Sequence, residues 1–151
     1  MCLDIVRRNF DPPFAHEAVA YKVMRVVTQP NESQQLRGLF QGSFNMEPEK
    51  WYKAEQYPIV IDALFHTGYN SGFHCFVSKK DAIDLLECLR PSKTLAGTEP
   101  QFVLVKVRIK GVTCYGIEAD LFWLKRDPKF DRDCKVVVCQ QMKIVDVQSL
   151  S

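Results

Sequence analysis

The sequence predicts an α+β fold in which a largely antiparallel sheet of five to seven strands packs with one principal helix, at about residues 79–90. Stretches rich in β-branched residues recur between turn signals, and a single segment has the spacing of an amphipathic helix. The 151 residues are 46% hydrophobic and 25% charged, which suits one hydrophobic core. Because no linker, repeat or low-complexity tract interrupts the sequence, we expect residues 1–151 to form a single α+β domain.

The N-terminal third contains the first predicted strands. Residues 19–27 favour a strand because their β-branched side chains fit a pleated surface. A short strand is expected before them at residues 2–7. Residues 36–44 are expected to return as a hairpin partner after a turn at residues 30–33.

A short apolar strand at residues 72–78 leads directly into the predicted helix. Ser78 stands where an N-cap belongs, and Asp81 adds a carboxylate to the first turn, where it complements the helix dipole. An apolar face follows at helical spacing, made of Ala82, Leu85, Leu86 and Leu89. Pro91 ends the pattern.

The clearest predicted strand covers residues 101–110. One of its faces is wholly apolar, and the other changes from apolar to basic, with Phe102 and Leu104 followed by Lys106, Arg108 and Lys110. We expect Gly111 to allow a turn and residues 112–117 to return as the hairpin partner. A long final strand is expected at residues 135–145, with one face made of Val136, Val138, Met142 and Ile144.

Two segments that mix charged and aromatic residues, 46–57 and 121–133, are predicted to be protruding loops. Exposed aromatic side chains commonly anchor protein interfaces, so we expect a partner protein to contact Trp51, Tyr52 and Trp123. A third loop is predicted at residues 66–72 from its glycine, threonine, serine and asparagine content.

The charge and hydropathy of the chain argue against some classes of partner. A formal net charge of +2 does not indicate binding to nucleic acid or to a membrane surface. No apolar run approaches the roughly 20 residues of a membrane-spanning helix, and the first residues lack the pattern of a secretion signal. We therefore expect a cytoplasmic protein whose partner is neither a membrane nor a nucleic acid.

Six cysteines are present, most of them in apolar stretches. In a reducing compartment such thiols stay reduced and pack as small apolar groups. Cys134 and Cys139 are close in sequence, but structural zinc sites usually need a second such pair, which is absent. We predict no bound metal.

Two histidines are the candidate ligand-binding groups. His74 and Cys75 are neighbours on a predicted strand, so their side chains point to opposite faces and do not form a nucleophile–base pair. His74 either packs as a hydrogen-bonded scaffold residue or points into a cleft beside the helix start, where anions bind well. His66 either bonds to the loop backbone or converges with His74 on a ligand.

A series of short motifs resembles small uncharacterised proteins of phages and their bacterial hosts that carry a Gly-Phe-His signature. The motifs are Tyr21-Lys22-Val23, Gly72-Phe73-His74, the helix containing Ala82 and the final Val-Val-Cys strand. The resemblance covers residues 19–145 and implies no activity. It makes a virus-encoded accessory protein that inhibits a host factor the expected type of function.

A second resemblance is to the ADP-ribosyltransferase superfamily. Phe65-His66-Thr67-Gly68 is similar to that family's His-Gly-Thr element with the last two residues reversed, and residues 72–78 are similar to its second NAD-binding strand. The resemblance implies that NAD or another nucleotide contacts His66, Gly68, His74, Ser78 and Gln141. Glutamines stand where the family has its catalytic glutamate, and a neutral amide cannot stabilise developing positive charge as a carboxylate does. This departure indicates binding without catalysis.

The sequence contains no complete catalytic constellation. We therefore expect a non-enzymatic binding protein that uses no cofactor and whose partner is a host or self protein. The alternative is an NAD- or nucleotide-binding protein of the ADP-ribosyltransferase type, with degenerate catalysis. A third hypothesis is a structural component of a larger particle, which would self-associate.

Overall fold

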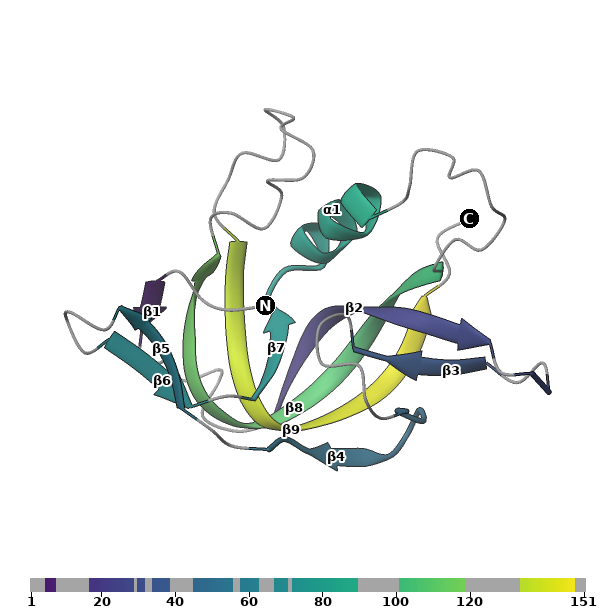
Figure 1. The fold of residues 1–151 in the computed structure, drawn as a ribbon, viewed down its shortest axis with the longest axis horizontal. Helices are drawn as coiled ribbons and strands as arrows, with labels where there is room; N and C mark the ends of the chain where they lie inside the picture. Colours follow the sequence, from purple (N-terminus) through teal and green to yellow (C-terminus); the bar gives the residue numbers. More distant parts are fainter. Residues whose placement is uncertain are drawn as a thin grey trace.

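A computed structural model describes residues 5–7, 17–28, 30–31, 34–38, 45–55, 58–62, 67–70, 72–89, 101–118 and 134–148. These residues form a seven-stranded antiparallel sheet, a separate two-stranded sheet and one helix, α1 (Lys79–Leu89), as Figure 1 shows. The smaller sheet pairs β5 (Pro58–Asp62) with β6 (Thr67–Asn70). The strands of the larger sheet are β1 (Ile5–Arg7), β2 (Ala18–Thr28), β3 (Gln34–Arg37), β4 (Trp51–Lys53), β7 (Phe73–Phe76), β8 (Gln101–Glu118) and β9 (Cys134–Gln148). The predicted α+β fold with one principal helix is confirmed.

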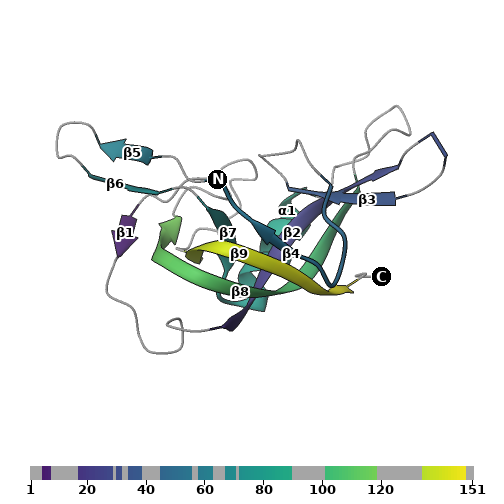
Figure 2. The ribbon, with the colours of Figure 1, turned by 90° about the horizontal axis from the view of Figure 1, so that it is seen from below.

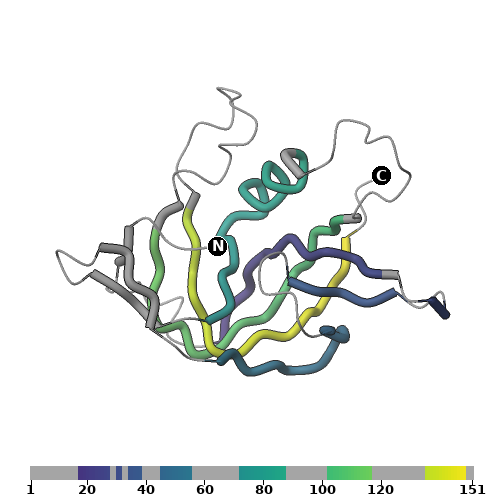
Figure 3. The backbone as a smooth tube through the Cα atoms, viewed as in Figure 1, coloured from purple at the N-terminus to yellow at the C-terminus, as the bar shows by residue number. Residues whose placement is uncertain are grey.

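The strand pairings of the larger sheet form a closed circuit. β8 pairs with β2 along one edge and with β9 along the other, and the two long strands run side by side (Figure 2). The far edge of β9 pairs with β7 and then with β4. β7 returns to β2 through one register pair, Tyr21 with Phe76. Because β8 and β9 bend strongly (Figure 3), helped by two register shifts between them, the sheet wraps into a small, partly closed barrel.

The side of the sheet that faces into this barrel carries the main apolar core. Its buried residues come from β2, β7, β8 and β9, and from the bridge that joins Met46 to Leu36 of β3. The cluster consists of Ala20, Met24, Met46, Phe73, Cys75, Val105, Val107, Ile109, Val137, Cys139, Met142 and Ile144. Lys22 supports the short β2–β7 junction, because its Nζ donates to the carbonyl oxygen of His74 at 2.8 Å.

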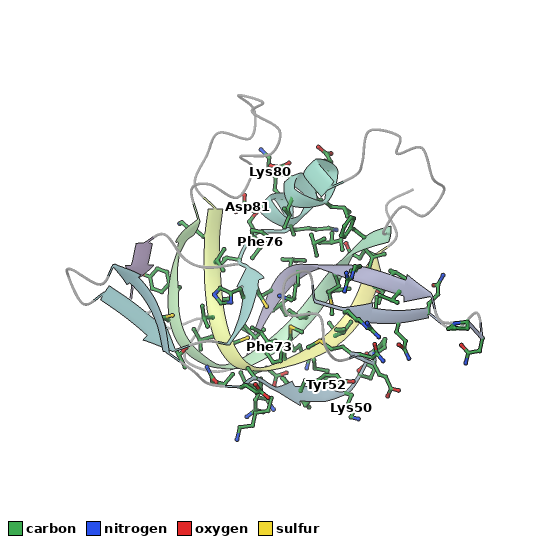
Figure 4. The ribbon with its side chains drawn as sticks, in the orientation of Figure 1. Lys50, Tyr52, Phe73, Phe76, Lys80 and Asp81 are labelled. Carbon is green, nitrogen blue, oxygen red and sulfur yellow. The ribbon has the colours of Figure 1, made fainter. Side chains whose placement is uncertain are left out.

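The helix packs on the outer face of the sheet. α1 contacts β2, β7 and β8, while its buried residues Ala82, Leu85 and Leu86 lie outside the interior cluster. Phe76, which is also buried, lies beneath α1 in Figure 4. Asp81 is buried in the first turn, where a carboxylate complements the helix dipole. The Ser78 carbonyl oxygen accepts the first helical hydrogen bond, at 3.4 Å, so the predicted helix start is confirmed.

One sequence prediction for the C-terminal half is wrong. Residues 101–110 and 112–117 do not form a hairpin, because β8 runs without interruption from Gln101 to Glu118. Gly111 adopts a φ of 66°, a left-handed conformation that glycine tolerates, and here it bends the strand instead of reversing it. The partner of β8 is β9, which pairs with it over almost its whole length.

Three further predictions need correction. The expected loop at residues 66–72 contains β6, and the expected loop at residues 46–57 contains β4. In β9 the interior cluster includes Val137 and Cys139, not Val136 and Val138, although residues 136–140 are all buried. The physical reason is that this part of β9 is covered on both faces, which removes the alternation on which the prediction relied. The expected segment at residues 121–133 lies outside the described residues.

Candidate functional site

The residues predicted to bind a nucleotide belong to several elements of the fold. Gly68 belongs to β6 of the smaller sheet, whereas Ser78 is exposed immediately before α1. Gln141 is exposed on β9, where its neighbours in register are Lys110 and Lys53. His66 lies outside the described residues. Gly68, Ser78 and Gln141 thus belong to different parts of the fold, and their joint role in binding a nucleotide stays a prediction.

His74 is buried, with 5% of its surface exposed. Its Nδ1 lies 3.2 Å from the carbonyl oxygen of Gly72, a distance at which a neutral ring donates from Nδ1. Burial lowers the pKa of His74 from 6.5 to about 3, and the nearby charge of Lys22 adds to this effect. The ring is therefore neutral at physiological pH, in the hydrogen-bonded scaffold position that was one of its two predicted roles.

Gly72, whose carbonyl oxygen lies near the His74 ring, approaches the backbone of β9 closely. A Cβ atom at position 72 would lie 2.5 Å from the carbonyl oxygen of Cys139 and 2.9 Å from a methyl group of Val138. Only glycine fits there without moving the backbone of β9. The Gly-Phe-His signature therefore has a packing role in this fold, because it lets β7 begin directly against β9.

Three of the cysteines are buried and free: Cys75, Cys114 and Cys139. Cys75 Sγ lies 3.8 Å from the sulfur of Met142, and Cys139 Sγ donates to the carbonyl oxygen of Phe73 at 3.6 Å. A hydrogen bond with Cys75, followed by burial, raises the pKa of Cys139 well above its usual value. Cys75 and Cys139 thus pack inside the barrel as small apolar groups, whereas Cys114 is buried outside the interior cluster.

The predicted aromatic anchors do not act as one exposed pair. Trp51 and Tyr52 are successive residues of β4, so their side chains point to opposite faces. Tyr52 packs against the interior cluster, and its hydroxyl oxygen accepts a hydrogen bond from the Glu47 amide at 2.7 Å. Figure 4 shows Tyr52 beside Lys50 at β4. Trp123, the third predicted anchor, lies outside the described residues.

Trp51 lies instead beside two cations, Lys143 of the neighbouring strand β9 and Lys110 of β8. The Nζ of Lys110 is 4.1 Å from the centre of a Trp51 ring, and the Nζ of Lys143 is 5.3 Å from it. Both distances are within the range of cation–π attraction. The half-buried indole therefore restrains two long side chains that would otherwise sample many rotamers.

The register of four strands places a mixed row of side chains across the outer face. Val19 of β2 is opposite Arg108 of β8, Arg108 is opposite Lys143 of β9, and Lys143 is opposite Trp51 of β4. Residues directly opposite one another in a sheet project from the same face. The row thus reads apolar, basic, basic, aromatic, and we call it the Val19–Trp51 row.

A surface pocket of about 310 Å³ opens along this row. The pocket is lined by Val19, Glu49, Lys106, Arg108, Lys143 and Val145. Val19 is 44% exposed, and the side chain of Arg108 is 54% exposed and makes a 3.2 Å ion pair with Glu17. The part of the outer face not covered by α1 therefore combines cations, apolar side chains and an indole.

Part of this surface was visible in the sequence. The alternation of residues 101–110 predicts that Lys106, Arg108 and Lys110 form the basic end of the outer face of a strand. The sequence does not indicate that Val19, Lys143 and Val145 lie beside these cations, because only the register of β2 and β9 against β8 brings them there.

The described residues contain no group of three or more histidine, cysteine, aspartate or glutamate side chains that could hold a metal ion. Among the same residues, the one helix is too short and too polar to cross a bilayer. Comparison with known proteins found no matching family model, no matching curated protein and no matching solved structure. The two resemblances seen in the sequence therefore stay predictions.

Proposed function

We propose that this protein is a non-catalytic binding module that engages a partner protein through the uncovered outer face of β2, β8, β9 and β4. The observation that carries the proposal is the Val19–Trp51 row, which crosses four strands and borders the 310 Å³ pocket. Tryptophan and arginine are the residue types most enriched at energetically important interface positions. The row contains one of each, and valine and lysine complete it.

The composition of this face supports recognition more than stability. Arg108 and Lys143 are directly opposite one another, and like charges in that position destabilise a sheet. Val19, which lies opposite Arg108 on the same face, exposes 44% of its surface. A partner that covers these groups would remove apolar surface from water and neutralise the paired cations, so binding would gain from both features.

The expected partner is a host factor or a second copy of the chain, as for an accessory protein or inhibitor. Both options use the same face in this proposal. An inhibitor needs no catalytic group, since occupying a partner's surface is sufficient. The proposal accordingly assigns no reaction and no cofactor to the protein.

The experiment compares retention of partners by three immobilised proteins: the wild type, Trp51→Ala and Lys80→Glu. Lys80 is exposed on α1, which Figure 4 shows away from β4, so its variant is a matched control for a changed surface charge. We expect a stoichiometric partner to be retained by the wild type and the control. Loss of a central tryptophan should weaken binding by about 30-fold or more, the range of an interface hot spot.

Two results would overturn the proposal. One is a partner retained equally by all three proteins, which would place the interface elsewhere. The other is an increase in melting temperature with NAD or another nucleotide, together with no retained partner, because a ligand that binds only the native state stabilises it. That result would favour the nucleotide-binding alternative.

A further inference from the structure

We infer that the pocket between Lys106, Arg108 and Lys143 binds a single carboxylate of an extended acidic segment in the partner protein. The inference rests on the proposed function, because it specifies the chemistry recognised by the same face. The pocket lining contains three cations and one carboxylate, that of Glu49. Its local charge is therefore positive while the chain as a whole is close to neutral, with a net charge of +2.

Two of the three pocket cations have contacts that restrain them before a ligand arrives. Lys143 is restrained by Trp51 and Arg108 by its ion pair with Glu17. Arg108 and Lys143 stand opposite one another in register, where like charges repel, and the Glu17 carboxylate offsets this repulsion only from the Arg108 side. A bound carboxylate would turn this repulsive pair into two attractive contacts with little loss of side-chain freedom.

The surroundings favour a monoanionic side chain over a phosphate backbone. Glu49 lines the pocket, Glu17 lies at Arg108, and Asp146 is opposite Lys106 in register. Three carboxylates so close to the cations would repel a polyanion along its length. Of these three carboxylates only Glu49 lines the pocket, so the lining keeps more cations than carboxylates, and Val19 and Val145 offer apolar contact to the methylene groups of an acidic side chain.

The spacing of the cations indicates an extended segment. Lys106, Arg108 and Lys110 alternate along β8, so consecutive members are separated by about 6.6 Å. Residues i and i+2 of an extended peptide have the same separation. The register row beyond the pocket, Lys110 with Gln141 and Lys53, would therefore meet a second acidic residue two positions along the partner segment.

The test measures binding of labelled, end-capped peptides to the full chain by fluorescence anisotropy. One peptide carries glutamate at alternate positions, separated by valine or threonine, and a second has the same composition with adjacent glutamates. We expect the alternating peptide to bind at least about tenfold more tightly, and to weaken about tenfold in each of Arg108→Gln and Lys143→Gln. Lys80→Gln is the matched control and should bind like the wild type.

A charge exchange tests whether residue 143 contacts the peptide directly. The Lys143→Glu variant should no longer bind the glutamate peptide, and it should bind a peptide that has lysine at the corresponding position. Unchanged melting temperatures in these variants would show that the fold is intact. The inference is overturned if the exchange recovers nothing, if both peptides bind equally, or if single-stranded DNA binds more tightly than the alternating peptide with the same dependence on Arg108 and Lys143.

The two proposals fail in different ways. If the partner protein is retained in a Trp51-dependent manner but no acidic peptide depends on Arg108 or Lys143, the carboxylate subsite is wrong and the interface remains. If the alternating peptide binds as expected but no protein partner depends on Trp51, the subsite is supported and the proposed partner interface is wrong.

Discussion

The outer face of β2 and β8 has two halves that differ in what covers them. In one half, Val23 and Leu104 are opposite one another and almost completely buried. Four residues along the same strands, Val19 and Arg108 are also opposite one another, and both are exposed. The helix lies on this face of β2 and β8, and we infer that it covers the first half. A single sheet face thus supplies a second core at one end and a candidate binding surface at the other.

This contrast shows that the basic character of β8 is confined to the outward side chains of its uncovered half. The strand keeps its alternation throughout, with Val105, Val107 and Ile109 facing the barrel interior behind both halves. Only the outward residues change, from leucine to lysine and arginine. The interior therefore stabilises the whole strand, and the outward residues of the uncovered half are free to serve recognition.

The largest expected difference between the halves is the cost of truncating an outward side chain. Leu104→Ala should lower the free energy of unfolding by about 2–5 kcal/mol, because it removes fully buried methyl groups and leaves a cavity. Arg108→Ala should change it by less than about 0.5 kcal/mol, as for most surface substitutions. Urea denaturation of both variants measures the contrast. Equal losses would show that the two halves do not differ in burial.

Acid should destabilise the fold through His74 of β7, which is buried like the covered half. The unfolded chain binds a proton at this ring near pH 6.5, whereas the pKa of the folded state is about 3, so the stabilisation is complete above pH 6.5 and is lost as the pH falls toward 3. Between pH 6.5 and 4.5 the loss from this group alone should be about 2–3 kcal/mol.

His74→Gln isolates that contribution. The amide does not titrate, so the difference between the two stability–pH curves should show the His74 dependence without that of the carboxylates. Chemical denaturation across this pH range gives both curves. Parallel curves would mean that the ring is accessible to protons in the folded state.

A smaller loss of stability is expected from a substitution at the junction between β2 and β7. Lys22→Met keeps a long side chain but removes the donor to the His74 carbonyl oxygen, where β2 and β7 share only one register pair. We expect a loss of about 1–2 kcal/mol, typical of a charged hydrogen bond in a partly buried site. Hydrogen exchange of the β7 amides should rise in the same variant, and unchanged exchange would place the support for this junction elsewhere.

The smallest expected effect is on the uncovered half itself. Lys143→Gln removes attraction to Trp51 and repulsion from Arg108 together, so the free energy of unfolding should change by less than about 0.5 kcal/mol. Thermal denaturation would check this. A loss as large as that of Leu104→Ala would show that Lys143 has a structural role.

The parts of the fold that depend on local sequence patterns were predictable. The helix was located within one residue at its C-terminal end because its capping residues and apolar spacing are local signals. The prediction of a hairpin at Gly111 was wrong because a glycine with positive φ can either bend a strand or reverse the chain. Which of these happens depends on the partner strand, which here is β9.

The candidate site was predictable only in part, for a related reason. Trp51 was identified as an interface residue from its charged neighbours, but its contact with Lys110 and Lys143 depends on pairings between β4, β9 and β8. His74 could not be assigned to core or cleft, because burial depends on what covers a strand. Register and cover are long-range properties that a single sequence does not display.

The position of β8 and β9 in the chain has a consequence for how the protein is made. Each of the other five strands of the larger sheet pairs either with β8 or β9 or with a strand that does so. Both β8 and β9 lie after residue 100. During synthesis β2 can pair with β3 and β7, but β1 and β4 must wait for β8 and β9, and the apolar side chains of β2 and β7 stay exposed until those strands are made. We expect the nascent chain to need protection by chaperones until residue 148 has left the ribosome.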